Sequence, residues 1–340
     1  MNGLLLMNLG TPTAPTTGAV RTYLKEFLSD PRVIDIHPIA RALLLYGVIL
    51  PFRPSRSAKA YAEVWTEEGS PLLVNSERLT EAVTEQMGQG WKVVLGMRYG
   101  QPAMSEALKQ LVDAGVDRIA VITMYPQYAT SSTGSMLEEL YRLAGTYEVP
   151  PRLTVATDFY DDPRFLEPSA ATVAERVAAF TPDHVLFSFH GLPERQIRRS
   201  TPDAQRCTLG NGCCDTIDAG NRHCYRAQSH HTARTIASAV GLTDDKWSIG
   251  FQSRLGRTPW IQPYTDELLP ELAQRGIKRL LISCPSFTAD CLETLEEIGI
   301  RAKEDFIAAG GEALELVPCL NDNPQWAAGV AQMARELIDS

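Results

Sequence analysis

The stretch "EALKQLVDAGVDRIAVITMYP", residues 106–126, decides the fold class of this chain. Its first half carries apolar residues at helical spacing and ends at a glycine, as helices commonly do. Its second half contains "IAVITM", which is apolar throughout and rich in β-branched residues, as strands buried on both faces are. The stretch therefore predicts a helix followed by a strand of a parallel sheet.

A second stretch, "DELLPELAQRGIKRLLISCP" at 266–285, repeats the same order of helix, glycine, basic residue, strand and proline. Two further pairs follow the same order along the chain: "LLLMNLGTP" (4–12) with "VLFSFHGLP" (185–193), and "VVLGMRYGQP" (93–102) with "SIGFQSRLGRTP" (248–259). The alternative is that all strand–helix units look alike. Three matches in one order favour a duplication.

The predicted fold is α/β, with two similar Rossmann-like lobes, each a parallel four-stranded sheet flanked by helices, and a cleft between them. We expect one lobe over 1–155 and the other over 156–340, with the last helix able to pack back on the first lobe. The expected strands are 4–8, 93–97, 119–124, 153–157, 185–189, 248–252, 280–284 and 314–318.

Composition restricts the function. The net charge of −9 and the lack of a basic stripe argue against nucleic acid as a partner. No signal peptide is recognisable at the N-terminus, so we expect a cytoplasmic protein, whose clustered cysteines favour metal over disulfides. The apolar run at 39–52 contains Arg41 and is too short to span a bilayer. It is a core helix, a lip over an apolar pocket or a membrane-surface contact.

The residues that follow the strands differ between the two halves. His190 follows "VLFSF" and stands where the first half has Leu9. Glu293 and Glu297 lie four residues apart, on one face of a helix-like run that opens after another strand. A core histidine and a solvated acidic face are the alternatives. An imidazole opposite carboxylates suits proton abstraction coupled to the handling of a divalent cation.

The predicted cleft lacks a phosphate-binding loop, because the sequence contains neither GxGxxG nor GxxxxGK[ST]. We therefore expect no nucleotide cofactor. Aromatic residues stand at the strand ends instead, and they imply a flat, apolar ligand held at its rim by Arg and Ser. These aromatics are Tyr99, Tyr125, Tyr128, Trp260 and Phe287.

Six motifs, in order along the chain, resemble those of the ferrochelatase family from residue 3 to about 330. They are "GMRYGQP", "YPQYATSSTGS", "FSFHGLPERQ", "FQSRLGRTPWIQPYTDE", "SCPSFTADCLETLEEI" and "VPCLNDNP". The resemblance implies a chelatase-like fold and insertion of Fe²⁺, as substrate, into protoporphyrin IX. The products are protohaem and two protons, in a late step of haem biosynthesis. Alternatives are coproporphyrin III as substrate, a cobalt chelatase, and a non-catalytic tetrapyrrole or metal carrier.

The resemblance also assigns roles to the polar residues of the second half. It implies that His190 and Glu293 are catalytic and that both, with Glu297 and Asp290, contact the substrate iron. It leaves open which of His190 and Glu293 takes the pyrrole protons. Two positions depart from the family pattern: Arg301 stands where an acid continues the acidic file, and Cys291 where histidine is common.

By the same resemblance, a set of residues lines the porphyrin site, and the segment at about 39–60 forms a lip over its mouth. The lip is also expected to rest on the cytoplasmic face of the inner membrane, while the oligomeric state stays open. The porphyrin-binding set is Arg56, Lys59, Ser70, Arg98, Tyr99, Tyr125, Ser131, Trp260 and Phe287.

The segment 207–224 holds four cysteines with the spacing C-x5-CC-x9-C: Cys207, Cys213, Cys214 and Cys224. Four thiolates can hold zinc or an iron–sulfur cluster. Zinc sites usually show C-x2-C pairs, and adjacent cysteines chelate one ion awkwardly. The spacing therefore favours a [2Fe–2S] cluster, as the resemblance also does, with zinc and free thiols or a site containing His223 as alternatives.

Overall fold

The chain forms two compact units in this computed structural model. The first comprises Met1–Tyr125, Ala129–Asp158 and Asn321–Ser340, and the second comprises Pro126–Tyr128 and Phe159–Leu320. The structure describes every residue except 202–206, 208, 211, 257 and 340. Two positions of the cysteine segment, Thr208 and Asn211, therefore lie outside the described residues.

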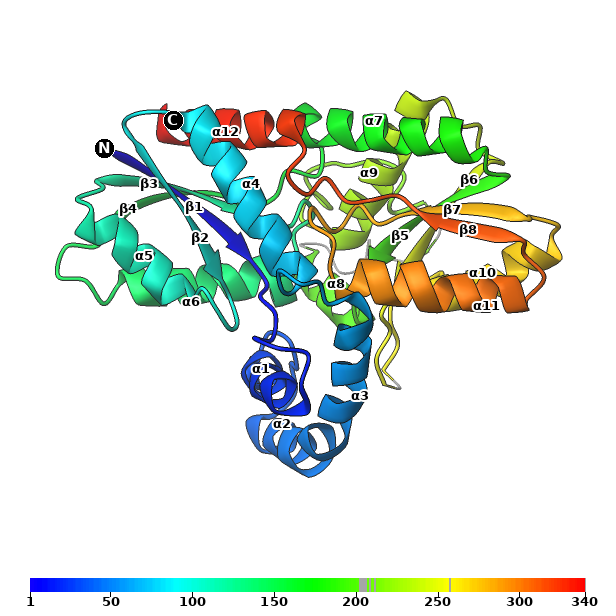
Figure 1. The fold of residues 1–340 in the computed structure, drawn as a ribbon, viewed down its shortest axis with the longest axis horizontal. Helices are drawn as coiled ribbons and strands as arrows, with labels where there is room; N and C mark the ends of the chain where they lie inside the picture. The colour runs from blue at the N-terminus through cyan, green and yellow to red at the C-terminus, as the bar shows by residue number, and fades with distance from the viewer. Residues whose placement is uncertain (202–206, 208, 211, 257, 340) are drawn as a thin grey trace. The chain divides into compact units, whose positions relative to one another are not determined.

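The first unit is built on a parallel sheet with the strand order β2-β1-β3-β4 (Figure 1). The strands are β1 (Asn2–Asn8), β2 (Trp91–Met97), β3 (Arg118–Thr123) and β4 (Arg152–Ala156). Leu5 and Val121 point from this sheet onto α5 and α6, where Leu108 and Leu140 complete one core cluster. The helices of this unit around the sheet are α4 (Pro71–Met87), α5 (Met104–Asp113), η2 (Thr130–Gly134), α6 (Ser135–Ala144) and α12 (Pro324–Asp339).

The second unit repeats this plan with the strand order β6-β5-β7-β8. The strands are β5 (His184–His190), β6 (Trp247–Gln252), β7 (Arg279–Ser283) and β8 (Ala313–Leu316). The helices are α7 (Pro163–Phe180), α8 (Glu194–Ser200), α9 (Tyr225–Val240), α10 (Thr265–Gln274), η3 (Glu293–Ala302) and α11 (Lys303–Ala308). The prediction of two similar parallel four-stranded sheets flanked by helices is confirmed.

In each unit the first two strands end side by side at the carboxyl edge of the sheet. Asn8 ends β1 opposite Met97, the last residue of β2. His190 ends β5 opposite Gln252, the last residue of β6. Because all strands of a sheet run in the same direction, the segments after the strands meet at one edge, and the second unit gathers His190 there.

The C-terminal helix α12 is part of the first unit although it follows the last strand of the second. It packs against α4 and against β3 and β4. Trp326 and Val330 are fully buried, and the Arg335 Nη2 donates a hydrogen bond to the Gln86 carbonyl at 2.6 Å.

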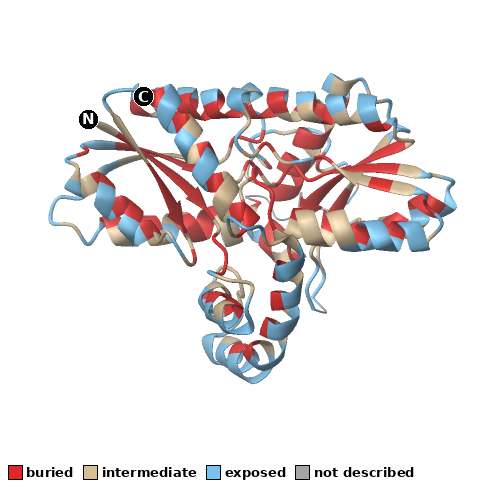
Figure 2. Cartoon of the chain, viewed as in Figure 1, coloured by how far each residue is buried: buried red, intermediate tan, exposed pale blue. Residues whose placement is uncertain are grey.

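A helical excursion of the first unit links β1 to α4. It consists of α1 (Thr17–Ser29), α2 (Pro38–Leu44), η1 (Leu45–Ile49) and α3 (Leu50–Val64), with α1 packed against α3. Large apolar side chains on α2, η1 and α3 are exposed: Leu43 is 70% exposed and Phe52 is 74% exposed (Figure 2). Among the residues that the structure describes, no helix combines the length and apolar character needed to cross a membrane.

Phe306 on α11 provides a test of the second unit's core. Its ring is fully buried in a cluster with Leu280, Ile282 and Ile298. We expect Phe306→Ala to reduce the free energy of unfolding by about 3–5 kcal/mol, because a large cavity is left behind. Ile307→Ala on the same helix, where the side chain is 40% exposed, should change it by less than about 1 kcal/mol. Urea unfolding followed by far-UV circular dichroism measures both, and equal losses would contradict this packing.

Candidate active site

His190 is held at the end of β5 by hydrogen bonds to its backbone. Its N–H donates to Ser286 Oγ at 3.1 Å, and Tyr225 Oη donates to its carbonyl at 2.8 Å. The ring Nδ1 lies 2.7 Å from the Gly191 carbonyl oxygen. A carbonyl oxygen only accepts, so Nδ1 carries the hydrogen and the neutral ring keeps its lone pair on Nε2. His190 is therefore oriented to accept a proton or bind a metal through Nε2.

Two aromatic side chains of the second unit flank this imidazole. The ring centroid of His190 lies 6.4 Å from that of Trp260 and 6.3 Å from that of Phe287. Both residues are among those predicted to bind the porphyrin. They make the surroundings of the imidazole apolar, which suits a flat, apolar ligand.

The acidic run begins a π-helix, η3, where the sequence analysis expects an ordinary helical run. Arg301 Nε lies 2.8 Å from Glu296 Oε1, an ion pair between residues five apart, as the wider π-helical turn allows. Positions four and five apart share a face in this geometry, so Glu293 and Glu297 remain together. Neither side chain is fully exposed.

Glu297 is held by Ser253, a residue that the sequence analysis did not single out. Its Oε1 accepts from the Ser253 N–H at 2.8 Å and its Oε2 accepts from Ser253 Oγ at 2.5 Å. Burial raises the pKa of Glu297 and the negative charge of Glu293 adds to the rise, while the Ser253 bonds and His190 oppose it. Glu297 is therefore within electrostatic range of both His190 and Glu293.

Ser253 reaches Glu297 from a left-handed backbone conformation, with φ at +65°. This conformation is uncommon for residues other than glycine and is often retained at functional sites. No sequence pattern marks it, because serine has no preference for positive φ. Only its position directly after β6 indicated that it faces the carboxyl edge of the sheet.

Asp290 is buried among thiol and hydroxyl groups rather than exposed to solvent. Its Oδ1 accepts from Thr294 Oγ1 at 3.1 Å and from the Cys319 N–H at 3.3 Å. Burial raises the pKa of the neighbouring Cys291 and Cys319 thiols far above their usual values. Asp290 is connected to the acidic run through Thr294, one residue after Glu293.

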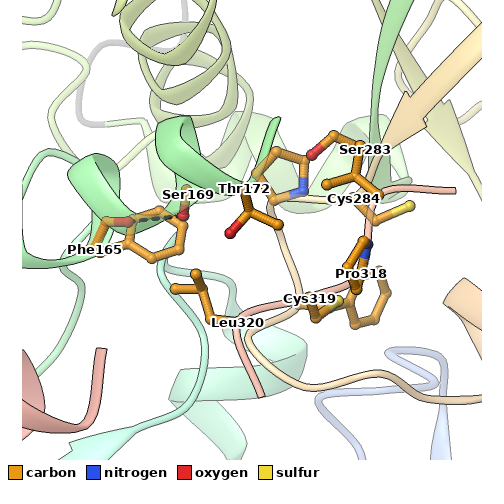
Figure 3. A pocket seen from close by; sticks show the side chains of 11 residues that line it. Phe165, Ser169, Thr172, Ser283, Cys284, Pro318, Cys319 and Leu320 are labelled. Atoms are coloured by element: carbon orange, nitrogen blue, oxygen red, sulfur yellow. Dashed lines mark hydrogen bonds between the residues drawn. The ribbon is translucent and has the colours of Figure 1, made fainter. Parts of the chain in front are cut away.

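A small cavity of about 20 Å³ lies in the second unit beside α7 and the ends of β7 and β8 (Figure 3). It has room for about one water molecule and none for a macrocycle. Cys284 and Cys319 face it together with Ser169 and Thr172. The thiols and hydroxyls around this cavity are therefore not the porphyrin site.

The porphyrin-binding residues predicted for the first unit fall into two groups. Arg56 and Lys59 are exposed and lie three residues apart on α3. Ser70 is buried at the start of α4, with its Oγ 2.7 Å from Thr11 Oγ1. Tyr125 and Ser131 are half-buried near the end of β3.

Arg98 and Tyr99 belong to a buried network around Asp30, which the sequence analysis missed. Asp30 Oδ2 accepts from Arg98 Nη2 at 2.7 Å, from Tyr99 Oη at 2.8 Å and from Ser135 Oγ at 2.5 Å. Burial opposes ionisation of Asp30, but the hydrogen bonds from Ser135, the Arg32 N–H and Tyr99, with the charge of Arg98, leave its pKa below the usual value. The network holds Arg98 and Tyr99 in place.

The four cysteines of the 207–224 segment lie in the second unit and interact in pairs. The sulfur atoms of Cys213 and Cys214 lie 3.7 Å apart, and Cys214 is hydrogen-bonded to Cys224. Cys207 interacts electrostatically with Cys213 and Cys224. Within the described residues, no three His, Cys, Asp or Glu side chains have the arrangement of a metal site. The described part of the segment therefore supplies thiol donors without arranging three of them as a metal site.

The surroundings of the thiols are electropositive. Arg226 Nη1 donates to Cys214 Sγ at 3.1 Å, and Arg234 Nη2 donates to the Cys214 carbonyl at 2.8 Å. The hydrogen bond with Cys214 lowers the pKa of Cys224; burial opposes this, and N–H groups at the start of α9 add to the lowering. These contacts favour the thiolate of Cys224. The hydrogen bond with Cys224 and burial raise the pKa of Cys214, and burial raises the pKa of Cys207.

Comparisons with known proteins show what the whole chain is similar to. The family described as Ferrochelatase matches residues 1–338. A curated ferrochelatase of Coxiella burnetii (strain CbuK_Q154) is 48% identical over 99% of this chain and 94% of its own length. One of Legionella pneumophila (strain Paris) is 44% identical over 99% of both chains. Two solved structures share the fold, each with a TM-score of 0.55. SirB from Bacillus subtilis with Fe³⁺ is 13% identical, and the match covers 99% of this chain and 96% of that one. The sirohydrochlorin chelatase SirB in complex with cobalt is 10% identical, and the match covers 100% of this chain and 96% of that one.

Asp30→Asn tests the network that holds Arg98 and Tyr99. Because folding lowers the pKa of Asp30, its charge stabilises the fold above about pH 4, and this contribution is lost as the pH falls through the folded pKa. We expect the free energy of unfolding of the variant to be lower than that of the parental protein by about 3 kcal/mol at pH 7, and by progressively less below pH 4. Asp113→Asn, at an exposed ion pair with Lys109, should leave the free energy of unfolding unchanged within experimental error. Urea unfolding at pH 3, 5 and 7 measures both; a loss at pH 7 no larger than that of the control would refute the assignment.

Proposed function

The chain belongs to the ferrochelatase family, and we propose that it inserts Fe²⁺ into protoporphyrin IX, giving protohaem and two protons. Metal-chelatase activity follows from the membership. The observation that carries the mechanism is the orientation of His190, whose Nδ1–H is bound by the Gly191 carbonyl while aromatic rings flank the imidazole.

The chemistry requires proton removal from a flat ring. A porphyrin holds two pyrrole N–H groups close to its plane, so metal enters only if the ring is distorted and both protons leave. Trp260 and Phe287 supply apolar surface against which a macrocycle packs, and binding energy can be used for its distortion. His190 Nε2 is the group suited to accept a pyrrole proton near neutral pH.

Metal insertion also requires that the iron loses its bound water, and carboxylates can replace that water as ligands. Carboxylate oxygens suit Fe²⁺ because it accepts hard oxygen ligands readily. Glu293 and Glu297 open the π-helix together, and Ser253 holds the carboxylate of Glu297 through two hydrogen bonds. We assign Glu293 the catalytic role beside His190, with Glu297 and Asp290 behind it as further contacts for the substrate iron. Arg301 ends this acidic run by pairing with Glu296.

The first unit supplies the groups proposed for the porphyrin rim. Arg56 and Lys59 are exposed cations on α3 and suit the two propionates of protoporphyrin. Arg98 is fixed by Asp30 and stacks on Tyr99, with its guanidinium carbon 4.6 Å from the ring centroid. Ser70, Tyr125 and Ser131 complete the proposed set, with Trp260 and Phe287 from the second unit.

The exposed apolar side chains of α2, η1 and α3 support the proposed lip at about 39–60. An exposed patch of large apolar side chains usually marks a binding site for a ligand, a protein or a membrane. Protoporphyrin is poorly soluble and partitions into membranes, so we propose that the lip also contacts the cytoplasmic face of the membrane peripherally. The patch consists of Ile39, Leu43, Tyr46, Val48 and Phe52.

We further propose that Cys207, Cys213, Cys214 and Cys224 hold a [2Fe–2S] cluster. The contact between the Cys213 and Cys214 sulfur atoms supports this proposal, as does the electropositive environment that Arg226 and the start of α9 give to Cys214 and Cys224. When bound, such a cluster supplies a one-electron redox centre and ties the segment to α9.

His190→Ala tests the proposed active site. We expect it to reduce insertion of Fe²⁺ or Zn²⁺ into protoporphyrin by about 10²-fold or more, because the proton acceptor is lost. Ile307→Ala, on the exposed face of α11, is the control and should retain parental turnover. The assay follows porphyrin fluorescence, with coproporphyrin III in parallel. Parental rates for His190→Ala would refute the site, and faster turnover of coproporphyrin would refute the choice of porphyrin.

Cys214→Ser tests the cluster. We expect the parental protein, purified anaerobically, to contain about two iron and two sulfide per chain and to absorb visible light, and the variant to lose both. Cys284→Ser, at a buried thiol outside the segment, should retain them. A colourless parental protein with one zinc per chain would contradict the cluster.

A further inference from the structure

Gln252 is a buried polar residue at the edge of the candidate active site with no assigned role. It ends β6, opposite His190, and its side chain is almost completely buried. Its Nε2 donates to the Glu293 carbonyl at 2.9 Å. Its Oε1 accepts from Ser188 Oγ at 2.8 Å and from Cys284 Sγ at 3.5 Å. One side chain thus links the ends of β5, β6 and β7 to the first residue of the π-helix.

These contacts allow the amide only one orientation. If the amide flipped, Oε1 would face the Glu293 carbonyl oxygen, and two acceptors would meet without a hydrogen between them. The Ser188 hydroxyl donates its hydrogen to Gln252. Thr265 Oγ1 lies 2.8 Å from Ser188 Oγ and therefore donates to it. The network is therefore directed from Thr265 through Ser188 and Gln252 to Glu293.

The equivalent position of the first unit also carries a side chain that bonds to a neighbouring segment. The Met97 N–H donates to the Pro102 carbonyl at 2.7 Å, as the Phe251 N–H donates to the Pro263 carbonyl at 2.8 Å, so Gln252 corresponds to Arg98. Arg98 binds Ser135 and Asp30 of its own unit. The end of β6 is bonded instead to the start of η3, which carries Glu293.

The backbone of Gln252 serves the same edge. Its carbonyl accepts from the Gly191 N–H at 2.8 Å, next to His190. The following residue, Ser253, binds the Glu297 carboxylate. The end of β6 is therefore bonded to the segments that carry His190, Glu293 and Glu297.

We propose that Gln252 is a positioning residue, which holds the start of η3 so that Glu293 keeps its place relative to His190. The inference rests on the proposed role of Glu293. Gln252 is bonded to the backbone of Glu293, so its loss shifts the carboxylate without removing it. A shift of about 1 Å at such a group costs up to about 10²-fold in rate. The groups proposed for the porphyrin rim are untouched.

Gln252→Met is the test, because methionine is similar to glutamine in length and volume but lacks the amide donor and acceptor. We expect kcat for Zn²⁺ or Fe²⁺ insertion to fall about tenfold to 10²-fold, while KM for protoporphyrin stays within about twofold. Gln252→Asn, which is too short to reach both Ser188 and Glu293, should reduce kcat in the same direction and covers the case in which the methionine variant fails to fold.

Thr265→Val is the matched control. It removes the outer hydroxyl of the same buried network and leaves the bond from Gln252 to Glu293 intact. We expect its melting temperature to fall as far as that of Gln252→Met, with kcat within about twofold of the parental value. Equal kcat losses in the two variants would overturn the inference, since they would show a merely structural role. Parental kcat in folded Gln252→Met would overturn it too.

A third variant separates this inference from the function on which it rests. Glu293→Gln should reduce kcat at least as far as Gln252→Met. If Glu293→Gln retains parental activity, the proposed function of the carboxylate fails. If Glu293→Gln is inactive while Gln252→Met is unaffected, only the positioning role of Gln252 fails.

Discussion

The parallel pairing of β5 with β6 places His190 directly opposite Gln252, and the candidate active site depends on this register. A strand shifted by one residue would turn every side chain to the other face of the sheet. In the observed register, β5 presents an imidazole, and β6 continues into the residues that bind Glu293 and Glu297. The positions of His190 and of the two carboxylates are thus set by the hydrogen bonds at the end of this sheet.

The two units show how one fold carries different chemistry at the same place. Both have the same strand order, and the residues at or directly after the ends of their equivalent strands are Leu9 and Arg98 in one, where the other has His190 and Gln252. The first unit uses its edge for a network around Asp30 that fixes Arg98 and Tyr99.

Much of this arrangement is predictable from the sequence, because it depends on local patterns. The apolar runs mark the strands, since strands buried on both faces exclude polar residues. The position of His190 after such a run predicts its place at the sheet edge. The spacing of Glu293 and Glu297 predicts that they share one face of a helix. They also share a face in the observed π-helix, because residues four and five apart lie together there.

Other features have no local signal, because they depend on contacts between residues distant in sequence. Asp30 lies 68 residues from Arg98 and 105 from Ser135, and Ser253 lies 44 residues from Glu297. Gln252 resembles any polar residue at the end of a strand until its amide is seen between Ser188 and Glu293.

The sequence by itself determined the α/β class, the duplication, and the residue types available at each strand end. Periodicity and composition suffice for these, because burial acts on each segment separately. Only the tertiary structure decided that Nδ1 of His190 is the protonated nitrogen, that the acidic run winds as a π-helix, and that Gln252 and Ser253 hold it. These outcomes depend on where hydrogen-bond partners from separate strands come to lie once the sheet has formed.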